Sequence, residues 1–219
     1  DLGLILLGSL VEAIAKMPLD VFISKYLFQN LGMVNTFYNP PDHKLNRIVP
    51  TEITSGYRSG LIHGEVHDEN AHKLGGVAGH AGLFSTAPEL ARFAQMMLNN
   101  GHYGRKRIFK DKTVKLFTQK AMIDTSSSRC LGWDSPSGNA SGGVFQSKNS
   151  YGHTGYTGTS VWIDPDYNLF VILLTNAVHP YRSYKDPAYF DWRQRIHSAV
   201  YESLGINDQN PKLTWRKQW

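Results

Sequence analysis

The chain has 219 residues, of which 41% are hydrophobic and 19% charged, a composition typical of a globular domain that buries a core. The formal net charge is +5, but the Lys and Arg residues are scattered apart from a short cluster at 104–107, which argues against a nucleic-acid-binding face. No apolar run approaches the roughly 18 residues of a membrane span. The only cysteine, Cys130, excludes an intrachain disulfide.

Two packed helices are predicted at the start of the chain. Leu7, Leu10, Val11 and Ile14 follow helical spacing, and Pro18 suits the first position of a second helix. The next segment, residues 35–75, is rich in Asn, Pro, His and Gly and has no sustained periodicity. We expect it to form long surface loops with short strands, and loops of that length usually serve a site.

A further helix is predicted after residue 85. Thr86 and Glu89 have the spacing of a capping box, apolar residues recur on one helical face, and Gly101 ends the pattern. Residues 111–120 predict another short helix, and the Ser- and Gly-rich residues 126–143 predict a loop.

Residues 151–176 predict a β-hairpin. We expect one strand at about 157–163, a turn at 164–166 and a second strand at about 168–175, which is apolar on both faces and should therefore be central. His153, Thr154 and Gly155 stand where the first strand opens, and glycine there would let a ligand approach backbone N–H groups. We interpret this as the edge of a site. Residues 186–205 then predict an amphipathic helix on the sheet.

Histidines and carboxylates at 63–72 raise the question of a metal site. Gly64 and Glu65 do not complete His-Glu-x-x-His, and the Gly- and Asn-containing context argues against a regular helix. We expect Asp68 and Asn70 to organise the loop backbone instead. The glycines of residues 75–86 lack a phosphate-loop pattern. We therefore predict no metal and no cofactor.

Three stretches, residues 2–33, 66–101 and 152–180, together resemble the serine β-lactamase and penicillin-binding-protein family, in particular its class C-like branch of β-lactamases, D-aminopeptidases and esterases. The resemblance covers most of the chain. It implies an α+β fold of the β-lactamase/transpeptidase type, in which helices flank an antiparallel sheet.

The resemblance also implies roles for individual residues. His153, Thr154 and Gly155 would be the His-Thr-Gly form of the family's Lys-Thr-Gly triad. The backbone amide of Tyr156 would help to hold the oxyanion, and Thr154 would contact a substrate carboxylate. The positions expected to line the substrate pocket are His80, Ala81 and Thr157.

One departure from the family pattern is decisive. The nucleophile of the family lies in Ser-x-x-Lys, and no such motif occurs in the 219 residues. The second motif, Tyr-x-Asn with variants ending in Ser or Asp, normally precedes the first helix found here, so we interpret Asp1 as its third, catalytic residue. We therefore expect the chain to be a C-terminal portion of one domain, with the first strands and the nucleophile helix upstream. Within it we expect a helical and loop lobe (1–143), the sheet hairpin and last helix (144–206) and a tail (207–219).

Two functions remain open. The first is a serine hydrolase that acts on β-lactam, D-Ala peptide or ester bonds through an acyl-enzyme, completed by an N-terminal fragment. The second is a non-catalytic penicillin- or peptidoglycan-binding module, which the missing Ser-x-x-Lys supports. The expected partner is a small-molecule or peptide substrate and not a nucleic acid. The resemblance implies a periplasmic or extracellular location in a bacterium, and we expect exposed apolar surface where upstream strands would pack.

Overall fold

The computed structural model of the chain describes residues 1–56, 58–121, 127–185 and 188–216. The chain divides into two compact units. The first unit contains residues 1–92 and 178–184, and the second contains residues 93–177 and 185–219.

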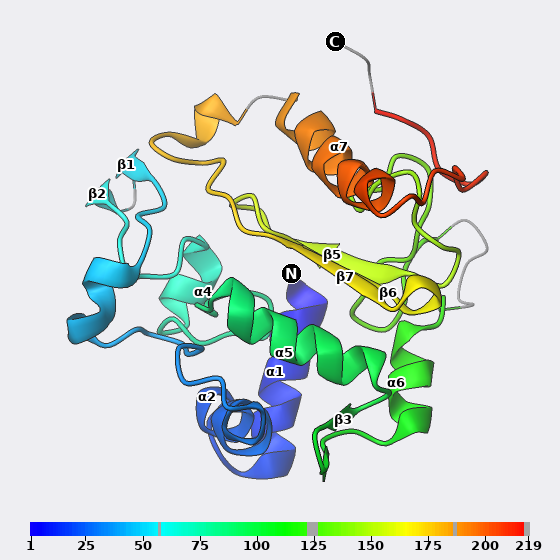
Figure 1. Ribbon diagram of the computed structural model, residues 1–219. Helices are drawn as coiled ribbons and strands as arrows, with labels where there is room; N and C mark the ends of the chain where they lie inside the picture. The colour runs from blue at the N-terminus through cyan, green and yellow to red at the C-terminus, as the bar shows by residue number, and fades with distance from the viewer. Residues whose placement is uncertain (57, 122–126, 186–187, 217–219) are drawn as a thin grey trace. The chain divides into compact units, whose positions relative to one another are not determined.

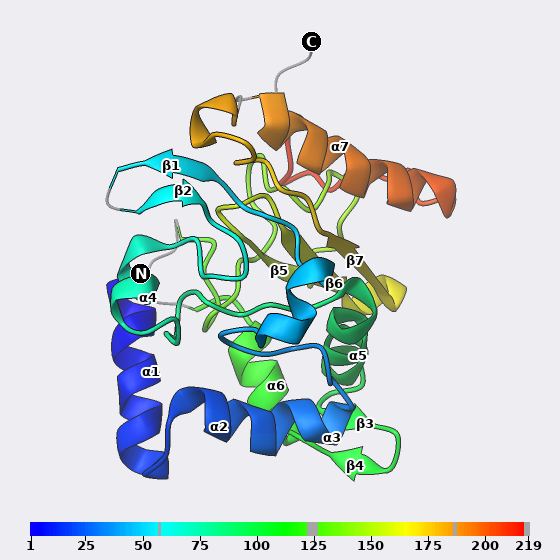
Figure 2. The same ribbon diagram turned by 90° about the vertical axis from the view of Figure 1, so that its left-hand side faces the viewer.

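The first unit opens with two helical segments, as the sequence predicts (Figure 2). Helix α1 (Leu2–Ala15) ends at Lys16, whose backbone is left-handed. A second segment runs through α2 (Leu19–Ile23), a π-helical turn η1 (Ser24–Phe28) and α3 (Gln29–Leu31). Pro18 lies one position earlier than expected, as the N-cap of α2, where its fixed φ and missing N–H cost no hydrogen bond.

Neither of these segments reaches the length and apolar character of a membrane span when taken alone, and the same holds for every other helix in the described part of the chain. Helix α1 and residues 19–31 meet the length and composition criterion only as a pair, and the pair is bent by 74°.

The rest of the first unit is largely irregular, as its composition predicts. It contains the 3₁₀ helix η2 (Asp42–Arg47), an antiparallel pair β1 (Ile53–Ser55) and β2 (Ser59–Leu61), and the short helix α4 (Glu69–Lys73). The later segment 178–184, which ends in η4 (Arg182–Tyr184), joins this region through a hydrogen bond from Ile53 N to Pro180 O at 2.7 Å. A small buried cluster of Val66, Ala71 and Ala78 forms a local core.

Helix α5 (Ala87–Leu98) begins in the first unit and ends in the second. The predicted capping box is wrong in one respect, because the Glu89 carboxylate does not turn back to Thr86. It is buried and accepts hydrogen bonds from Asn35 N, at 2.9 Å, and from the Thr36 hydroxyl. Gly101 ends the helix as predicted, with φ +92° and a hydrogen bond from its N to Met96 O. The pair β3 (His102–Tyr103) and β4 (Lys106–Arg107) and helix α6 (Asp111–Thr118) follow.

The main sheet lies in the second unit and has three described strands (Figure 1). They are β5 (Tyr151–Thr154), β6 (Ser160–Asp164) and β7 (Leu169–Leu173), paired antiparallel in the order β5-β6-β7. The predicted hairpin corresponds to β6 and β7, joined through a 3₁₀ turn η3 (Pro165–Tyr167). The expectation that β7 is central is wrong for the described strands, because β6 lies between the other two and β7 is half-buried.

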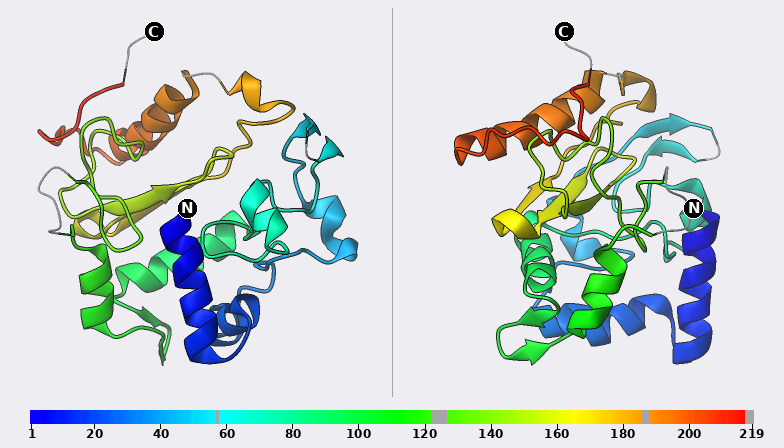
Figure 3. Two further views of the ribbon diagram at one scale, coloured as in Figure 1. Left: turned by 180° about the vertical axis from the view of Figure 1, so that it is seen from behind. Right: turned by 90° about the vertical axis from the view of Figure 1, so that its right-hand side faces the viewer.

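Helix α7 (Ala188–Ser203) covers one face of this sheet (Figures 1 and 3). Alternate β6 residues point to it: the Ser160 hydroxyl lies 2.9 Å from His197 Nε2, and Tyr201 Oη donates to Asp164 Oδ2 at 2.9 Å. On the opposite face, the Trp133 ring lies 5.4 Å from that of Tyr151. The second unit is therefore an antiparallel sheet with helices around it, as the predicted α+β class requires.

Candidate functional site

The His-Thr-Gly segment lies at the end of β5. The sequence predicts that it opens a strand, and the structure corrects this: His153 pairs with Val161 and Thr154 with Ser160, and these are the last two residues of β5. Because strand residues alternate between faces and opposed residues share one, Thr154 points to the α7 side with Ser160. His153 points to the other side, with Val161.

The five residues after Thr154 form the tight connection to β6. Gly155 N donates to Thr159 O at 2.8 Å, and Gly158 N donates to Gly155 O at 3.2 Å. A Cβ at Gly155 would clash with Thr159 Oγ1, so this position needs glycine for packing inside the hairpin. Thr157 is held from outside the turn, because its carbonyl accepts from Ala177 N at 2.7 Å.

Tyr156 stands at the exposed corner of this turn, with 59% of its surface accessible. The Lys185 ammonium lies 3.9 Å from the centre of the Tyr156 ring and donates to the Tyr156 carbonyl. Burial, and then the charge of Arg193, lower the pKa of Lys185 from its usual value. The Lys185 cation therefore stabilises the turn that carries the predicted oxyanion amide.

His153 is held by two neighbours. Its Nδ1 lies 2.9 Å from Thr154 O, and its Nε2 lies 3.4 Å from Arg129 Nη1. Arg129 in turn forms an ion pair with Asp134, at 2.9 Å, and the backbone of Asp134 pairs with Gly152 of β5. Sequence reasoning missed Arg129 because nothing in the Ser-rich loop 126–143 marks one arginine as a partner of a residue 24 positions later.

In the first unit, His80 forms a pair with Asp68. His80 Nε2 lies 2.9 Å from Asp68 Oδ1, and only 3% of the His80 side chain is exposed. Asp68 Oδ1 also accepts from Ala71 N at 2.8 Å as the N-cap of α4, which confirms its predicted role in organising backbone. Burial raises the pKa of Asp68, but hydrogen bonds from Ala71 and His80 outweigh burial and lower it overall.

The other two first-unit candidates are Ala81, which follows His80 in the sequence, and Asp1. Ala81 packs against the small core of Val66, Ala71 and Ala78. Asp1 is the N-cap of α1 and makes no side-chain capping bond. The glycine-rich loop that carries His80 rests on the same helix, because a Cβ at Gly8 would lie 3.1 Å from Gly79 N. At Gly79 the requirement for glycine is stronger, because a Cβ there would clash with Leu4 O of the helix.

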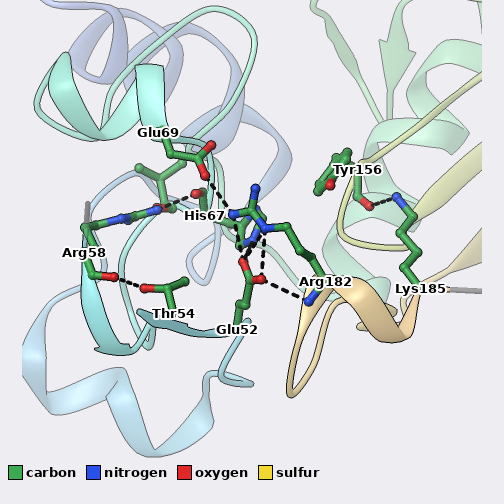
Figure 4. Close-up of polar contacts among 9 residues, drawn as sticks. Glu52, Thr54, Arg58, His67, Glu69, Tyr156, Arg182 and Lys185 are labelled. Atoms are coloured by element: carbon green, nitrogen blue, oxygen red, sulfur yellow. Dashed lines mark hydrogen bonds and ion pairs between the residues drawn. The ribbon is translucent and has the colours of Figure 1, made fainter. Parts of the chain in front are cut away.

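A second polar cluster occupies the first unit (Figure 4). Arg182 donates from Nε to both oxygens of Glu52, at 2.9 and 3.0 Å, and from Nη2 to Glu69 Oε1 at 2.7 Å. His67 Nε2 lies 2.8 Å from Glu52 Oε2, and both side chains are buried. Burial raises the pKa of Glu52, but the hydrogen bonds from Arg182 and His67 outweigh it and lower the pKa to about 2. Glu52 is therefore ionised.

Glu52, Glu69 and Arg182 line an open pocket of about 410 Å³ together with Thr54, Arg58 and Tyr181. Arg58 donates to Val66 O at 2.6 Å and to His67 O, which fixes the loop before α4. Sequence reasoning missed this cluster because its members are up to 130 residues apart.

The residues weighed as metal ligands have separate partners. His63 Nε2 lies 2.8 Å from Ile48 O, and His72 Nδ1 lies 3.6 Å from Glu65 Oε2. Within the described ranges, no group of three or more His, Cys, Asp or Glu side chains is arranged to hold a metal ion.

The predicted site residues thus form two groups. His153, Thr154, Gly155, Tyr156 and Thr157 are contiguous in the second unit, at the end of β5 and in the turn after it. Asp1, His80 and Ala81 belong to the first unit.

Comparison with known proteins gives the context of this geometry. A family model described as Beta-lactamase matches residues 1–195. A curated relative from Salmonella schwarzengrund, named "Putative D-alanyl-D-alanine carboxypeptidase", is 40% identical in an alignment 196 residues long, and the match covers 82% of this chain and 45% of that protein. A Salmonella newport protein of the same name is 39% identical with the same coverage. The chain therefore spans less than half the length of these curated relatives.

Solved structures agree on the fold. A simvastatin synthase from Aspergillus terreus has a TM-score of 0.68 at 17% identity, covering 91% of this chain and 54% of its own. A β-lactamase from Mycobacterium bovis gives 0.62 at 18% identity, covering 92% and 62%. A penicillin-binding-protein homologue from Caulobacter crescentus gives 0.63 at 15% identity, covering 90% and 55%. At these identities the likeness shows a β-lactamase/transpeptidase fold, and with the family match and the curated relatives it follows that the chain belongs to the β-lactamase family.

Proposed function

We propose that the chain is part of a serine hydrolase of the β-lactamase and penicillin-binding type, which cleaves D-Ala peptide, β-lactam or ester bonds through an acyl-enzyme. The observation that carries the proposal is the end of β5, where His153 and Thr154 lead directly into the exposed turn at Tyr156. Family membership and relatives named as carboxypeptidases support it. The nucleophile belongs to a Ser-x-x-Lys outside the 219 residues.

In this proposal the residues of the turn bind and polarise the substrate. The Tyr156 amide helps to hold the oxyanion that forms when a serine attacks the carbonyl carbon, and Thr154 contacts the substrate carboxylate. The Lys185 contacts fix the Tyr156 backbone, so that the amide does not have to reorganise during the reaction. For the first unit, we propose that Asp1 is a catalytic residue and that His80 and Ala81 contact substrate.

The test is the intact mass of the protein after incubation with a penicillin-type acylating probe. Two proteins are compared: the 219-residue chain, and a version extended upstream to the length of the curated relatives. We expect an adduct on the extended protein alone. An adduct on the 219-residue chain would mean that one of its own serines reacts, and the site assignment would then be wrong. No adduct on either protein, with the probe bound reversibly, would favour the non-catalytic binding module.

A partner that completes the fold is part of the proposal. Helix α1 exposes a row of large apolar side chains, among them Leu2, Leu6 and Ile14, which are 77%, 69% and 75% accessible. Such a surface is costly in water, so we propose that the remainder of the domain covers it. Co-expression of the 219-residue chain with the upstream remainder of the domain tests this. A stable complex that is lost in Leu6→Glu supports the proposal, and a chain that stays monomeric with or without this change contradicts it.

We also propose that the complete protein works outside the bacterial cytoplasm, where peptidoglycan peptides and β-lactams occur. The curated relatives, bacterial proteins named as putative D-alanyl-D-alanine carboxypeptidases, support this location. Fractionation of a bacterium that expresses the complete protein tests it, and recovery in the cytoplasm alone would contradict it.

A further inference from the structure

We propose that Arg129 is a positioning residue that fixes the tautomer of His153. The evidence is the arrangement of three side chains at the end of β5. Arg129 Nη1 lies 3.4 Å from His153 Nε2 and 2.9 Å from Asp134 Oδ1, and His153 Nδ1 lies 2.9 Å from Thr154 O.

The chemistry of these contacts allows one assignment. A carbonyl oxygen only accepts, so His153 Nδ1 must carry the hydrogen that is donated to Thr154 O. A guanidinium only donates, so His153 Nε2 must be the unprotonated acceptor of the Arg129 N–H. The imidazole is therefore the neutral Nδ1–H tautomer. The hydrogen bond made by one ring nitrogen determines whether the other nitrogen carries a hydrogen.

The position of Arg129 is itself fixed. Its Nη1 forms an ion pair with Asp134 Oδ1 at 2.9 Å and a hydrogen bond with His153 Nε2 at 3.4 Å. Asp134 exchanges two backbone hydrogen bonds with Gly152, at 2.8 and 2.9 Å, and Gly152 is the neighbour of His153 in β5. Asp134, whose carboxylate pairs with Arg129, is therefore hydrogen-bonded through its backbone to the strand that carries His153.

The charge at this position follows from the same contacts. Where the resembled family carries a lysine, this chain has a neutral imidazole, and the positive charge lies on the Arg129 guanidinium behind it. His153 then presents a polar but uncharged ring, and the cation stays held by Asp134. A wrong tautomer would reverse which nitrogen donates, and such reversals are costly in catalysis. This catalytic consequence rests on the proposed function, whereas the tautomer assignment does not.

The test is the long-range ¹H–¹⁵N spectrum of the ¹⁵N-histidine-labelled 219-residue chain, at a pH of about 8.5 where histidines are neutral. The chain has nine histidines, and His153→Gln identifies the signals of His153. In the wild type we expect a protonated Nδ1 and an unprotonated Nε2. In Arg129→Met, which removes the donor at similar length, we expect the Nε2–H form to become populated. Arg129→Lys, which keeps a cationic donor, should largely restore the wild-type pattern.

Two controls separate positioning from folding. Arg107→Met removes an equally exposed arginine from its pair with Asp111, and should leave His153 unchanged. The other eight histidines report whether Arg129→Met is still folded. A protonated Nε2 in the wild type, or an unchanged pattern in a folded Arg129→Met, would overturn the inference.

The same variants in the upstream-extended protein test the catalytic consequence. We expect Arg129→Met to slow adduct formation at least about 10-fold and Arg129→Lys to recover most of the loss. If the extended wild type forms no adduct while the spectra are as expected, the proposed function fails and the tautomer assignment stands. If adduct forms and Arg129→Met reacts at the wild-type rate, the inference about Arg129 fails and the hydrolase proposal stands.

Discussion

Arg182 donates a bifurcated hydrogen bond to Glu52, with its Nε at 2.9 and 3.0 Å from the two carboxylate oxygens, although 130 residues separate them in the sequence. The Glu52 side chain is 5% exposed and ionised. A buried carboxylate needs such partners, because the loss of solvation is recovered only through charged hydrogen bonds.

Arg182→Met should therefore lower the free energy of unfolding by about 3 kcal/mol, since the buried Glu52 charge loses the guanidinium and keeps hydrogen bonds to His67 and to the backbone N–H of residue 182. Urea denaturation measures the change. Arg107→Met is the matched control, because its pair with Asp111 is more than half exposed and should contribute little to stability. Equal effects of the two changes would mean that the cluster in Figure 4 does not stabilise the loops it connects.

His197 should make the stability of the chain fall in mild acid. Burial, and then the charge of Arg193, lower the pKa of His197 to about 4 from an ordinary value of 6.5. Between pH 6.5 and about 4, His197 is protonated in the unfolded chain but stays neutral in the folded chain. The free energy of unfolding therefore decreases as the pH falls through this range. The loss should reach about 3 kcal/mol at most.

Comparison of His197→Gln with wild type by urea denaturation at several pH values measures this effect. Glutamine can keep a hydrogen bond to Ser160 but does not titrate, so the slope of stability against pH should become shallower between pH 6.5 and 4. His43→Gln changes an exposed histidine of η2 and should leave the slope near that of the wild type. A slope unchanged in His197→Gln would show that His197 is not kept neutral by burial.

The sequence predicts the elements that depend on local pattern. Helices α6 and α7 and strands β6 and β7 follow from apolar periodicity and from the turn residues at 164–166, and all four are found within a few residues of their expected bounds. The sequence pattern does not set β5 apart from β6, because Gly152 has weak strand propensity. Gly152 fits there because the Trp162 ring occupies the space that a Cβ would need, a long-range contact that composition does not reveal.

The hydrogen-bond partners of polar side chains are also hard to predict from the sequence, because they come from distant parts of the chain. Glu89 has the spacing of a capping box, but Asn35 and Thr36 bring backbone and hydroxyl donors from a distant loop and take its carboxylate. The Arg129 contact with His153 likewise depends on the bend of a Ser-rich loop. The His-Thr-Gly motif suggests a candidate site in the sequence, but the charged residues that contact it, such as Arg129, cannot be predicted from the sequence.

Gly155→Ala should destabilise the turn between β5 and β6 by about 1–2 kcal/mol, because the new Cβ would overlap with Thr159 Oγ1. Thr159→Ala removes that oxygen, so the cost of Gly155→Ala should shrink in the Thr159→Ala background. A double-mutant cycle from urea denaturation gives the coupling directly. Additive effects would show that the cost of Gly155→Ala does not arise from the Thr159 hydroxyl oxygen.

His153→Ala, in the upstream-extended protein, should lower the rate of acylation by a penicillin-type probe about 100-fold. The change removes the ring that links Thr154 O to Arg129, while the β5 backbone pairing with Val161 is unaffected. Mass spectrometry at successive times measures the rate, and thermal unfolding confirms that the variant folds. His43→Ala, on an exposed turn of the first unit, should react at the wild-type rate. A folded His153→Ala that acylates as fast as wild type would show that the end of β5 is not part of the reacting site.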